Sequence, residues 1–250
     1  MSDVVLIHAG IADSRMWEPQ LRSFAPSHRV IAPDLPGFGQ TPLDQDPVDF
    51  RTAVRGAMDA AGMERAALVG TSFGGMISLE LALETPERVS ALVLVGASID
   101  DHAWSDEMEE FDKTEAAALE RGDLDAAADA MVSGWVAGPR RELDAVDPEV
   151  RNLVSEMQRN AYELQQGHDE VRSKRLDPPA SQRLTEIRMP TLVLTGDEDF
   201  GDIHQIADRL AAEIPGAERA TIADAAHLPN LERPEEFDRI VLGFLRQHGV

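Results

Sequence analysis

A serine, a group of aspartates and a histidine occur along this chain in an order that can activate a serine hydroxyl. Ser72 lies in the run Gly-Thr-Ser-Phe-Gly at 70–74, a G-x-S-x-G pattern. An apolar run at 66–69 precedes it and an apolar helical run at 76–83 follows it. This strand–turn–helix setting is the one that a nucleophile elbow requires. The alternative interpretation is an ordinary glycine-rich turn.

A serine hydroxyl is a weak nucleophile until a base removes its proton. In elbow enzymes the partners come later in the chain, in the order Ser, Asp or Glu, His. Here the apolar run 191–195 leads into Gly-Asp-Glu-Asp at 196–199, and the run 218–222 leads toward His227. The order predicts a triad of Ser72, an acid of the 196–199 loop and His227. A histidine outside such an order is more simply a surface or core residue.

The elements that must position these residues alternate between strand and helix. Short, mostly apolar runs predict strands at 4–8, 29–32, 66–69, 91–95 and 191–195, and a sixth strand is predicted at 218–222. Helical spacing predicts helices at 14–24, 48–63, 76–83, 203–214 and 234–248. This alternation predicts an α/β fold with a mostly parallel sheet of about six strands and helices on both faces.

Between 100 and 180 the alternation stops. That stretch holds no convincing strand pattern, and helices are predicted near 105–121, 124–136 and 148–170. We therefore expect a core built from residues 1–99 and 181–250, with a helical insertion at 100–180.

Several landmarks together resemble the α/β-hydrolase fold family over almost the whole chain. They are His-Ala-Gly at 8–10, Asp-Leu-Pro-Gly-Phe-Gly at 34–39, Gly-Thr-Ser-Phe-Gly-Gly at 70–75, Gly-Asp-Glu-Asp at 196–199 and Ala-His-Leu-Pro-Asn-Leu-Glu-Arg-Pro-Glu-Glu-Phe at 226–237. The overall pattern is similar to 3-oxoadipate enol-lactonase-like and small esterase-like members. The resemblance implies an α/β-hydrolase sheet and a helical cap, or lid, at 100–180.

The resemblance also implies roles for single residues. Ser72 resembles the nucleophile, His227 the general base and Asp199 the triad acid. Alternatives for the acid are Asp197 and Asp202. Some members place the acid after the preceding strand, which here would be Asp100.

The oxyanion hole of this family uses two backbone N–H groups. The first belongs to Phe73, the residue after the nucleophile. The resemblance assigns the second to Gly10, with Ile11 as the alternative. The residue before Gly10 is Ala9, where the family has glycine.

A second departure lies at the start of the chain. The family has a two-strand hairpin before the segment that contains 4–8, and this hairpin is missing here. The strand at 29–32 is therefore expected at the edge of the sheet. Because exposed edges invite pairing, we expect another segment or a second subunit, as in a homodimer, to cover it.

The cap and the loops beside the motifs are expected to wall the substrate site. The predicted substrate-binding residues are Ile11, Trp104, Trp135, Phe200 and Leu228. Further candidates are Trp17, Phe73, Met108, Met131, Met157 and Tyr162. The alternative for each cap residue is that it only packs the cap on the core.

Serine at position 72 excludes the dehalogenase and epoxide-hydrolase chemistry that an aspartate there would suggest. Hydrolysis of a small-molecule ester or lactone through an acyl-enzyme remains, with no metal and no cofactor. A carbon–carbon bond hydrolase, or a cofactor-free haloperoxidase or perhydrolase, would use the same triad. A ligand receptor with little turnover is the alternative of another class.

Composition excludes other classes of protein. The formal net charge of −23 and the lack of a basic run argue against binding to nucleic acid or to an anionic membrane. The chain has no cysteine, which excludes thiol nucleophiles and cysteine-ligated metals. No signal peptide pattern and no long apolar stretch occur, so a cytoplasmic protein is expected.

Overall fold

A computed structural model of the protein describes residues 1–44, 47–167 and 173–250. Its centre is one six-stranded sheet in the order β2-β1-β3-β4-β5-β6, and every neighbouring pair is parallel. The strands are β1 (Ser2–Ile7), β2 (His28–Ile31), β3 (Ala66–Thr71), β4 (Val89–Val95), β5 (Thr191–Gly196) and β6 (Glu218–Ile222). The predicted parallel sheet is confirmed, and β2 lies at its edge as expected. That a second subunit or another segment covers this edge stays a prediction.

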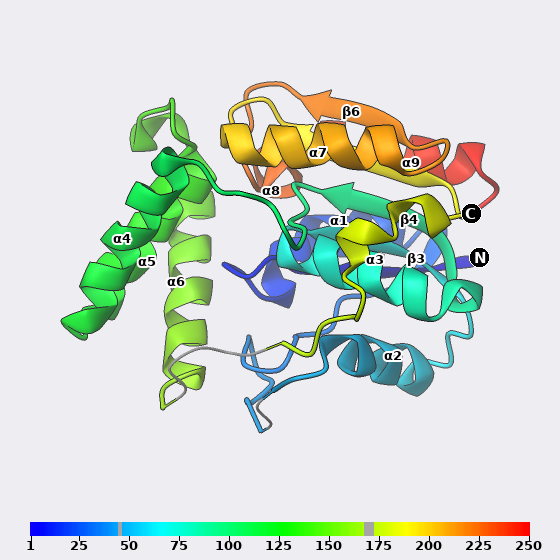
Figure 1. Cartoon of the computed structure of the whole chain (residues 1–250), viewed down its shortest axis with the longest axis horizontal. Helices are drawn as coiled ribbons and strands as arrows, with labels where there is room; N and C mark the ends of the chain where they lie inside the picture. The colour runs from blue at the N-terminus through cyan, green and yellow to red at the C-terminus, as the bar shows by residue number, and fades with distance from the viewer. Residues whose placement is uncertain (45–46, 168–172) are drawn as a thin grey trace.

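Helices cover both faces of the sheet (Figure 1). One face buries its apolar side chains against α1 (Glu18–Phe24) and α9 (Pro234–Gln247). The other buries them against α2 (Phe50–Ala60), α3 (Phe73–Glu84) and α7 (Gly201–Glu213). Successive strand residues point to opposite faces, so β1 sends Val4 and Leu6 into the first cluster and Val5 and Ile7 into the second. This double burial explains why the central strands β1, β3, β4 and β5 are rich in consecutive apolar residues.

Short helical turns complete the core. They are η1 (Ser14–Trp17), η2 (Pro86–Arg88), η5 (Ala180–Gln182), η6 (Leu184–Glu186) and the one-turn helix α8 (Pro229–Glu232). Within the described residues, no helix is both long and apolar enough to cross a membrane.

The block between β4 and η5 contains helices α4 (Asp106–Glu120), α5 (Leu124–Met131) and α6 (Pro148–Leu164), with the turns η3 (Val132–Ala137) and η4 (Leu143–Ala145). These helices stand beyond the carboxyl ends of the strands, on the side toward which the arrows point (Figure 1). We call this block the cap. That it acts as a lid, with the predicted bounds 100–180, stays a prediction.

Two cap helices end earlier than their sequence pattern indicates. The helix predicted over 124–136 changes at Met131 into η3, a π-helical turn. A Cβ on Gly134 would come within 2.0 Å of the Phe111 ring, so tight packing of α4 against this turn accompanies the change. The helix predicted over 148–170 ends at Leu164, and Gly167 with φ +88° follows it. Residues 168–170 of that prediction lie outside the described residues.

Candidate active site

The turn between β3 and α3 holds Ser72 in a strained backbone conformation. Ser72 has φ +53° and ψ −114°, a region that costs a residue with a side chain on the order of 1–3 kcal/mol. The surrounding structure enforces it, because the Ser72 N–H donates to the Val95 carbonyl at 2.8 Å and its own carbonyl accepts the Met76 N–H at 3.1 Å. The side chain is thereby left partly exposed at the carboxyl end of β3.

Glycines on both sides of Ser72 allow this turn to close. A Cβ on Gly70 would lie 2.3 Å from the Gly74 carbonyl oxygen, and one on Gly74 would lie 2.3 Å from the Ile7 carbonyl oxygen. Both contacts are with backbone atoms that cannot move aside. The G-x-S-x-G pattern is therefore a packing requirement of the turn, and the amino end of α3 lies directly after Ser72.

His227 and Asp199, which we call the dyad, form a buried pair in the loops that follow the last two strands. His227 Nδ1 lies 2.8 Å from Asp199 Oδ2, and both side chains are at most 2% exposed. The other oxygen, Asp199 Oδ1, accepts the Phe200 N–H at 2.9 Å. An ionised carboxylate only accepts hydrogen bonds, so the ring proton sits on Nδ1 and the lone pair is on Nε2. This is the tautomer that a general base for Ser72 needs.

The alternative acids lie elsewhere. Asp197 is exposed. Asp202 accepts hydrogen bonds from His102 Nε2 at 2.9 Å and from the Ser105 hydroxyl at 2.6 Å, where the chain enters the cap. The structure therefore brings Asp199, and not these two, to His227.

Asp100 is engaged with a cation instead. Its carboxylate lies 2.7 Å from the Arg175 guanidinium, and Arg175 also donates to Glu80 on α3 at 2.8 Å. These contacts join the segment that leaves the core for the cap to the segment that returns from it.

No hydrogen bond joins Ser72 to His227 within the described residues. Among the hydrogen bonds of the described residues, none involves the Ser72 hydroxyl. Catalytic hydrogen bonds in unliganded enzymes are often long and tighten when substrate binds. Gly96, at the end of β4, lies directly beside the dyad, since a Cβ on it would be 3.1 Å from His227 Nδ1.

The two predicted oxyanion donors lie side by side. A Cβ on Gly10 would be 3.7 Å from Phe73 Cβ. Within the described chain, the backbone N–H groups of Gly10, Ile11 and Phe73 donate to no protein acceptor. Gly10 and Phe73 thus present unused donors near Ser72, and Ile11 remains the alternative to Gly10.

His8 fixes the loop that carries Gly10. The ring is fully buried; Nδ1 lies 2.8 Å from the Ala9 carbonyl oxygen and Nε2 accepts the Leu35 N–H at 3.0 Å. Burial lowers the pKa of His8, against smaller opposing contributions from Ala9 and nearby carboxylates. A neutral His8 therefore ties the Gly10 loop to the 34–39 loop.

A group of aromatic rings from the cap and the core contacts the dyad through Trp135. The Trp135 ring packs on the His227 ring with centroids 4.3 Å apart, and it also meets Phe200 at 5.1 Å. Phe111 of α4 closes the group, 5.4 Å from Phe200. Trp135 thus contacts His227, and Phe200 contacts Trp135. Their role in binding substrate stays a prediction.

The other predicted pocket residues are placed differently. Ile11 and Leu228 are buried in the hydrophobic cluster on the α1 and α9 face. Trp104 is 39% exposed and contacts the His102 ring edge to face. Their contact with a substrate stays a prediction.

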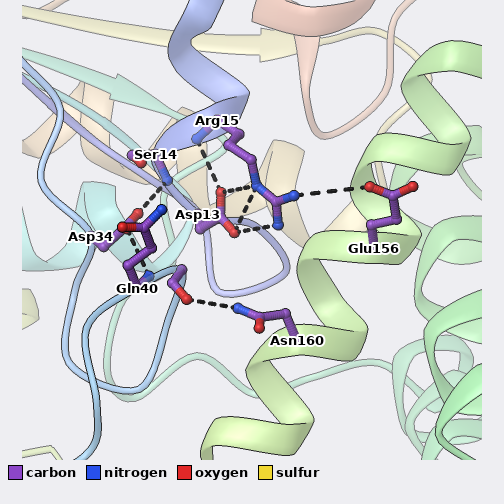
Figure 2. A pocket seen from close by; sticks show the side chains of 8 residues that line it. Asp13, Ser14, Arg15, Asp34, Gln40, Glu156 and Asn160 are labelled. Carbon is purple, nitrogen blue, oxygen red and sulfur yellow. Dashed lines mark hydrogen bonds and ion pairs between the residues drawn. The ribbon is translucent and has the colours of Figure 1, made fainter.

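Figure 2 shows a polar pocket of about 310 Å³ where α6 meets the core loops. Asp34 accepts the Ser14 and Gln40 N–H groups there, and Asn160 of α6 donates to the Gly39 carbonyl. Arg15 pairs with Asp13 at 2.8 Å. The polar groups bond to one another, and none of the predicted site residues lines this pocket.

Within the described residues, no group of three or more His, Asp or Glu side chains is arranged to hold a metal ion.

Sequence reasoning missed four residues that touch the dyad or its loops, namely Gly96, Arg140, Arg141 and Glu232. Arg140 and Arg141 follow Gly-Pro in the cap, which signals a turn but not its target. Glu232 lies inside the 226–237 segment. The sequence pattern includes this glutamate but does not indicate which residue it pairs with.

Comparison with known proteins agrees with this geometry. The model of the family described as alpha/beta hydrolase fold matches residues 4–234. The chain is 26% identical to carboxylesterase YbfK of Bacillus subtilis, over 97% of this chain and 79% of that protein. It is also 26% identical to 2-hydroxy-6-oxo-6-phenylhexa-2,4-dienoate hydrolase of Comamonas testosteroni, over 98% and 87% of the two chains.

Among solved structures, Est816, described as an N-acyl homoserine lactone degrading enzyme, matches with a TM-score of 0.75 and 25% identity, over 98% of this chain and 93% of that one. The family match spans the elbow, the Asp199 loop and His227. The chain therefore belongs to the α/β-hydrolase fold family.

Proposed function

We propose that this chain is a serine hydrolase that cleaves carboxylic esters or lactones through an acyl-enzyme. Ser72 is the nucleophile, His227 the general base, and Asp199 holds the imidazole in its working tautomer. The observation that carries the proposal is the buried 2.8 Å contact between His227 Nδ1 and Asp199 Oδ2. It leaves Nε2 as the free ring nitrogen at the end of the sheet where Ser72 lies in its strained turn.

In the first half-reaction the Ser72 Oγ attacks the ester carbonyl carbon while His227 Nε2 takes the hydroxyl proton. The carbonyl oxygen gains negative charge, which the N–H groups of Phe73 and Gly10 stabilise. The tetrahedral intermediate then collapses: the bond to the alcohol oxygen breaks, and His227 returns its proton to that oxygen. In a lactone the released alcohol stays attached to the acyl chain.

In the second half-reaction water takes the place of the alcohol. His227 Nε2 removes a proton from the water as its oxygen attacks the acyl carbon, and the same donors stabilise the oxyanion. Collapse breaks the bond to Ser72 Oγ, which recovers the proton from His227. The products are the free acid and the original enzyme.

The surroundings of the site support a neutral, partly apolar substrate. The Trp135 ring packs on His227 and also contacts the Phe200 ring, which in turn contacts Phe111. The polar groups of the Figure 2 pocket bond to one another. The chain is a hydrolase acting on ester bonds, in keeping with relatives that are named as a carboxylesterase and a lactone-degrading enzyme.

The test is hydrolysis of a p-nitrophenyl ester series from acetate to octanoate, together with a γ-lactone, by the wild type and by Ser72→Ala. Loss of the nucleophile should lower turnover by several orders of magnitude. Labelling by a fluorophosphonate, located by peptide mass spectrometry, should modify Ser72 alone. Turnover that survives Ser72→Ala would contradict the proposal.

A carbon–carbon bond hydrolase is the second candidate, because the chain is as similar to the dienoate hydrolase of Comamonas testosteroni as to the carboxylesterase. The same Ser72, Asp199 and His227 would serve it. The two are separated by comparing kcat/KM for a vinylogous diketone and for the best ester. A higher value for the diketone would favour the second candidate, and tight binding without turnover of either would favour a receptor.

A further inference from the structure

A segment of the cap, residues 135–141, passes between the loop that carries Asp199 and the loop that carries His227. Gly138 marks the closest approach. It has φ +81°, and a Cβ on it would lie 2.2 Å from the Glu198 carbonyl oxygen and 3.2 Å from Ala226 Cβ. Only glycine fits between these two loops, so the segment is in direct contact with both.

The segment binds the acid loop through Arg140. This guanidinium donates to the Asp197 carbonyl at 2.8 Å and to the Asp199 carbonyl at 3.2 Å, and it lies 3.4 Å from the Glu198 carboxylate. The contacts are with the backbone on both sides of the turn that presents Asp199.

The segment binds the histidine loop through Arg141, whose side chain is almost buried. Arg141 pairs with Glu232 of α8 at 2.7 Å, and the Glu232 carboxylate is only 4% exposed. The same guanidinium donates to the Asp224 carbonyl at 3.1 Å and back to the Ala137 carbonyl of its own segment at 2.7 Å. The ion pair therefore joins the cap, the start of the histidine loop and α8.

Two successive backbone N–H groups of the histidine loop donate hydrogen bonds to Glu232 and to the cap segment. The second oxygen of Glu232 accepts the Ala226 N–H at 2.7 Å. The Trp135 carbonyl accepts the His227 N–H at 3.1 Å. The backbone that carries the imidazole is thus fixed on one side by the ion pair and on the other by the cap segment itself.

We propose that Arg141 and Glu232 are positioning residues of the catalytic histidine, and that the 135–141 segment makes the cap part of the scaffold of the triad. The inference rests on the proposed function of Ser72, His227 and Asp199. A base must lie within hydrogen-bond reach of the proton that it removes, and a misplacement of about 1 Å can lower a rate about 100-fold. Loss of the ion pair frees the Ala226–His227 backbone on one side and so costs rate in the chemical step.

The variants separate charge, geometry and bulk. Arg141→Met keeps the aliphatic stem and removes every guanidinium contact. Arg141→Lys keeps the charge with a shorter reach and should recover part of the activity. Glu232→Gln keeps an acceptor for the Ala226 N–H but turns an amide toward Arg141. Arg140→Ala, at a half-exposed position, loosens only the acid loop.

We expect Arg141→Met and Glu232→Gln to lower kcat for a p-nitrophenyl ester roughly 10- to 100-fold, with KM changed less than threefold. The second-order rate of fluorophosphonate labelling of Ser72 should fall by the same factor, because that reaction also depends on the base. Arg141→Lys should lie between Arg141→Met and the wild type in both measurements.

The matched control is Glu80→Gln. Glu80 is also an almost fully buried carboxylate, 2% exposed, that pairs with an arginine, Arg175, at 2.8 Å. It touches neither loop of the dyad. The control should lower the melting temperature as the Glu232 variant does and leave kcat and labelling unchanged.

The outcomes separate this inference from the proposed function. If the wild type neither turns over esters nor reacts at Ser72, the proposed function fails. If the wild type is active and Ser72→Ala is not, but Arg141→Met and Glu232→Gln lose stability alone, the ion pair is structural and the inference is overturned. Should Arg141→Met not fold, Arg141→Lys and Glu232→Gln decide in the same way.

Discussion

The backbone of Gly96 lies against the imidazole of His227. Gly96 directly follows β4 and has φ +49°, and a Cβ there would be 3.1 Å from both Cε1 and Nδ1 of His227 and 3.4 Å from Asp199 Oδ2. The residue that follows β4, the strand paired with β3, therefore forms one wall of the dyad. The imidazole of His227 occupies the space that a side chain at position 96 would need.

Gly96→Ala should consequently reduce activity more than it reduces folding. The new methyl group moves the imidazole by a few tenths of an ångström, and we expect kcat to fall roughly tenfold. The positive φ adds a loss of about 1 kcal/mol in the free energy of unfolding. Steady-state kinetics and urea denaturation measure the two effects.

Gly56→Ala is the matched control for that variant. Gly56 lies inside α2, and a Cβ there meets no atom within 4 Å. Alanine should raise the free energy of unfolding by roughly 0.5–1 kcal/mol and leave kcat as it is. Equal kinetics for the two variants would contradict the contact with His227.

The assignment of the triad acid is tested by two amides. Asp199→Asn turns an NH₂ group or a neutral oxygen toward His227 Nδ1, which favours the wrong tautomer, and kcat should fall by about 10³–10⁴. Asp202→Asn removes an equally buried carboxylate that serves His102 and Ser105. It should change kcat less than threefold. The reverse order of the two effects would transfer the acid role to Asp202.

The elbow, the two later loops and the sheet could be predicted because their signals are local. Ser72 and Asp199 follow the buried strands β3 and β5 within a few residues, and His227 lies five residues beyond the partly exposed edge strand β6. Parallel strands bring their carboxyl ends to one edge. The glycines of the elbow are fixed by contacts within the same turn or with β1. For these residues, the order of residue types along the chain is enough to predict which side chains lie close together.

The contacts of the cap could not be predicted in this way. Arg141 and Glu232 are 91 residues apart, and no periodicity links a guanidinium in one segment to a carboxylate in another. At the π-helical turn 132–137, Phe111 of α4 packs closely against Gly134. Local sequence there favours a continuous helix, and tertiary packing decides against it.

The second oxyanion donor is tested by a pair of substitutions at Gly10. Gly10→Ala keeps the N–H, and its methyl group meets only Phe73 Cβ, at 3.7 Å. Gly10→Pro removes the N–H. We expect near wild-type kcat for the first and a loss of about 10²–10³ for the second, with circular dichroism confirming that both fold. If Ile11→Pro rather than Gly10→Pro shows this loss, Ile11 supplies the donor.

The burial of His8 should make stability depend on pH near neutrality. Burial lowers the pKa of His8 below its ordinary value of 6.5. As the pH falls below 6.5, the unfolded chain takes up a proton at this ring and the folded chain does not, so the unfolded state is favoured. The stability is complete above 6.5 and is lost as the pH falls toward the folded value.

His8→Gln isolates this effect, since every other titrating group is shared with the wild type. Between pH 7.5 and 5.5 the wild type should lose more of its free energy of unfolding than the variant does, by at most about 1.4 kcal/mol. Urea denaturation at the two pH values measures the difference. Parallel pH dependence in the two proteins would mean that His8 is protonated in the fold, and the neutral link between the Gly10 loop and Leu35 would be wrong.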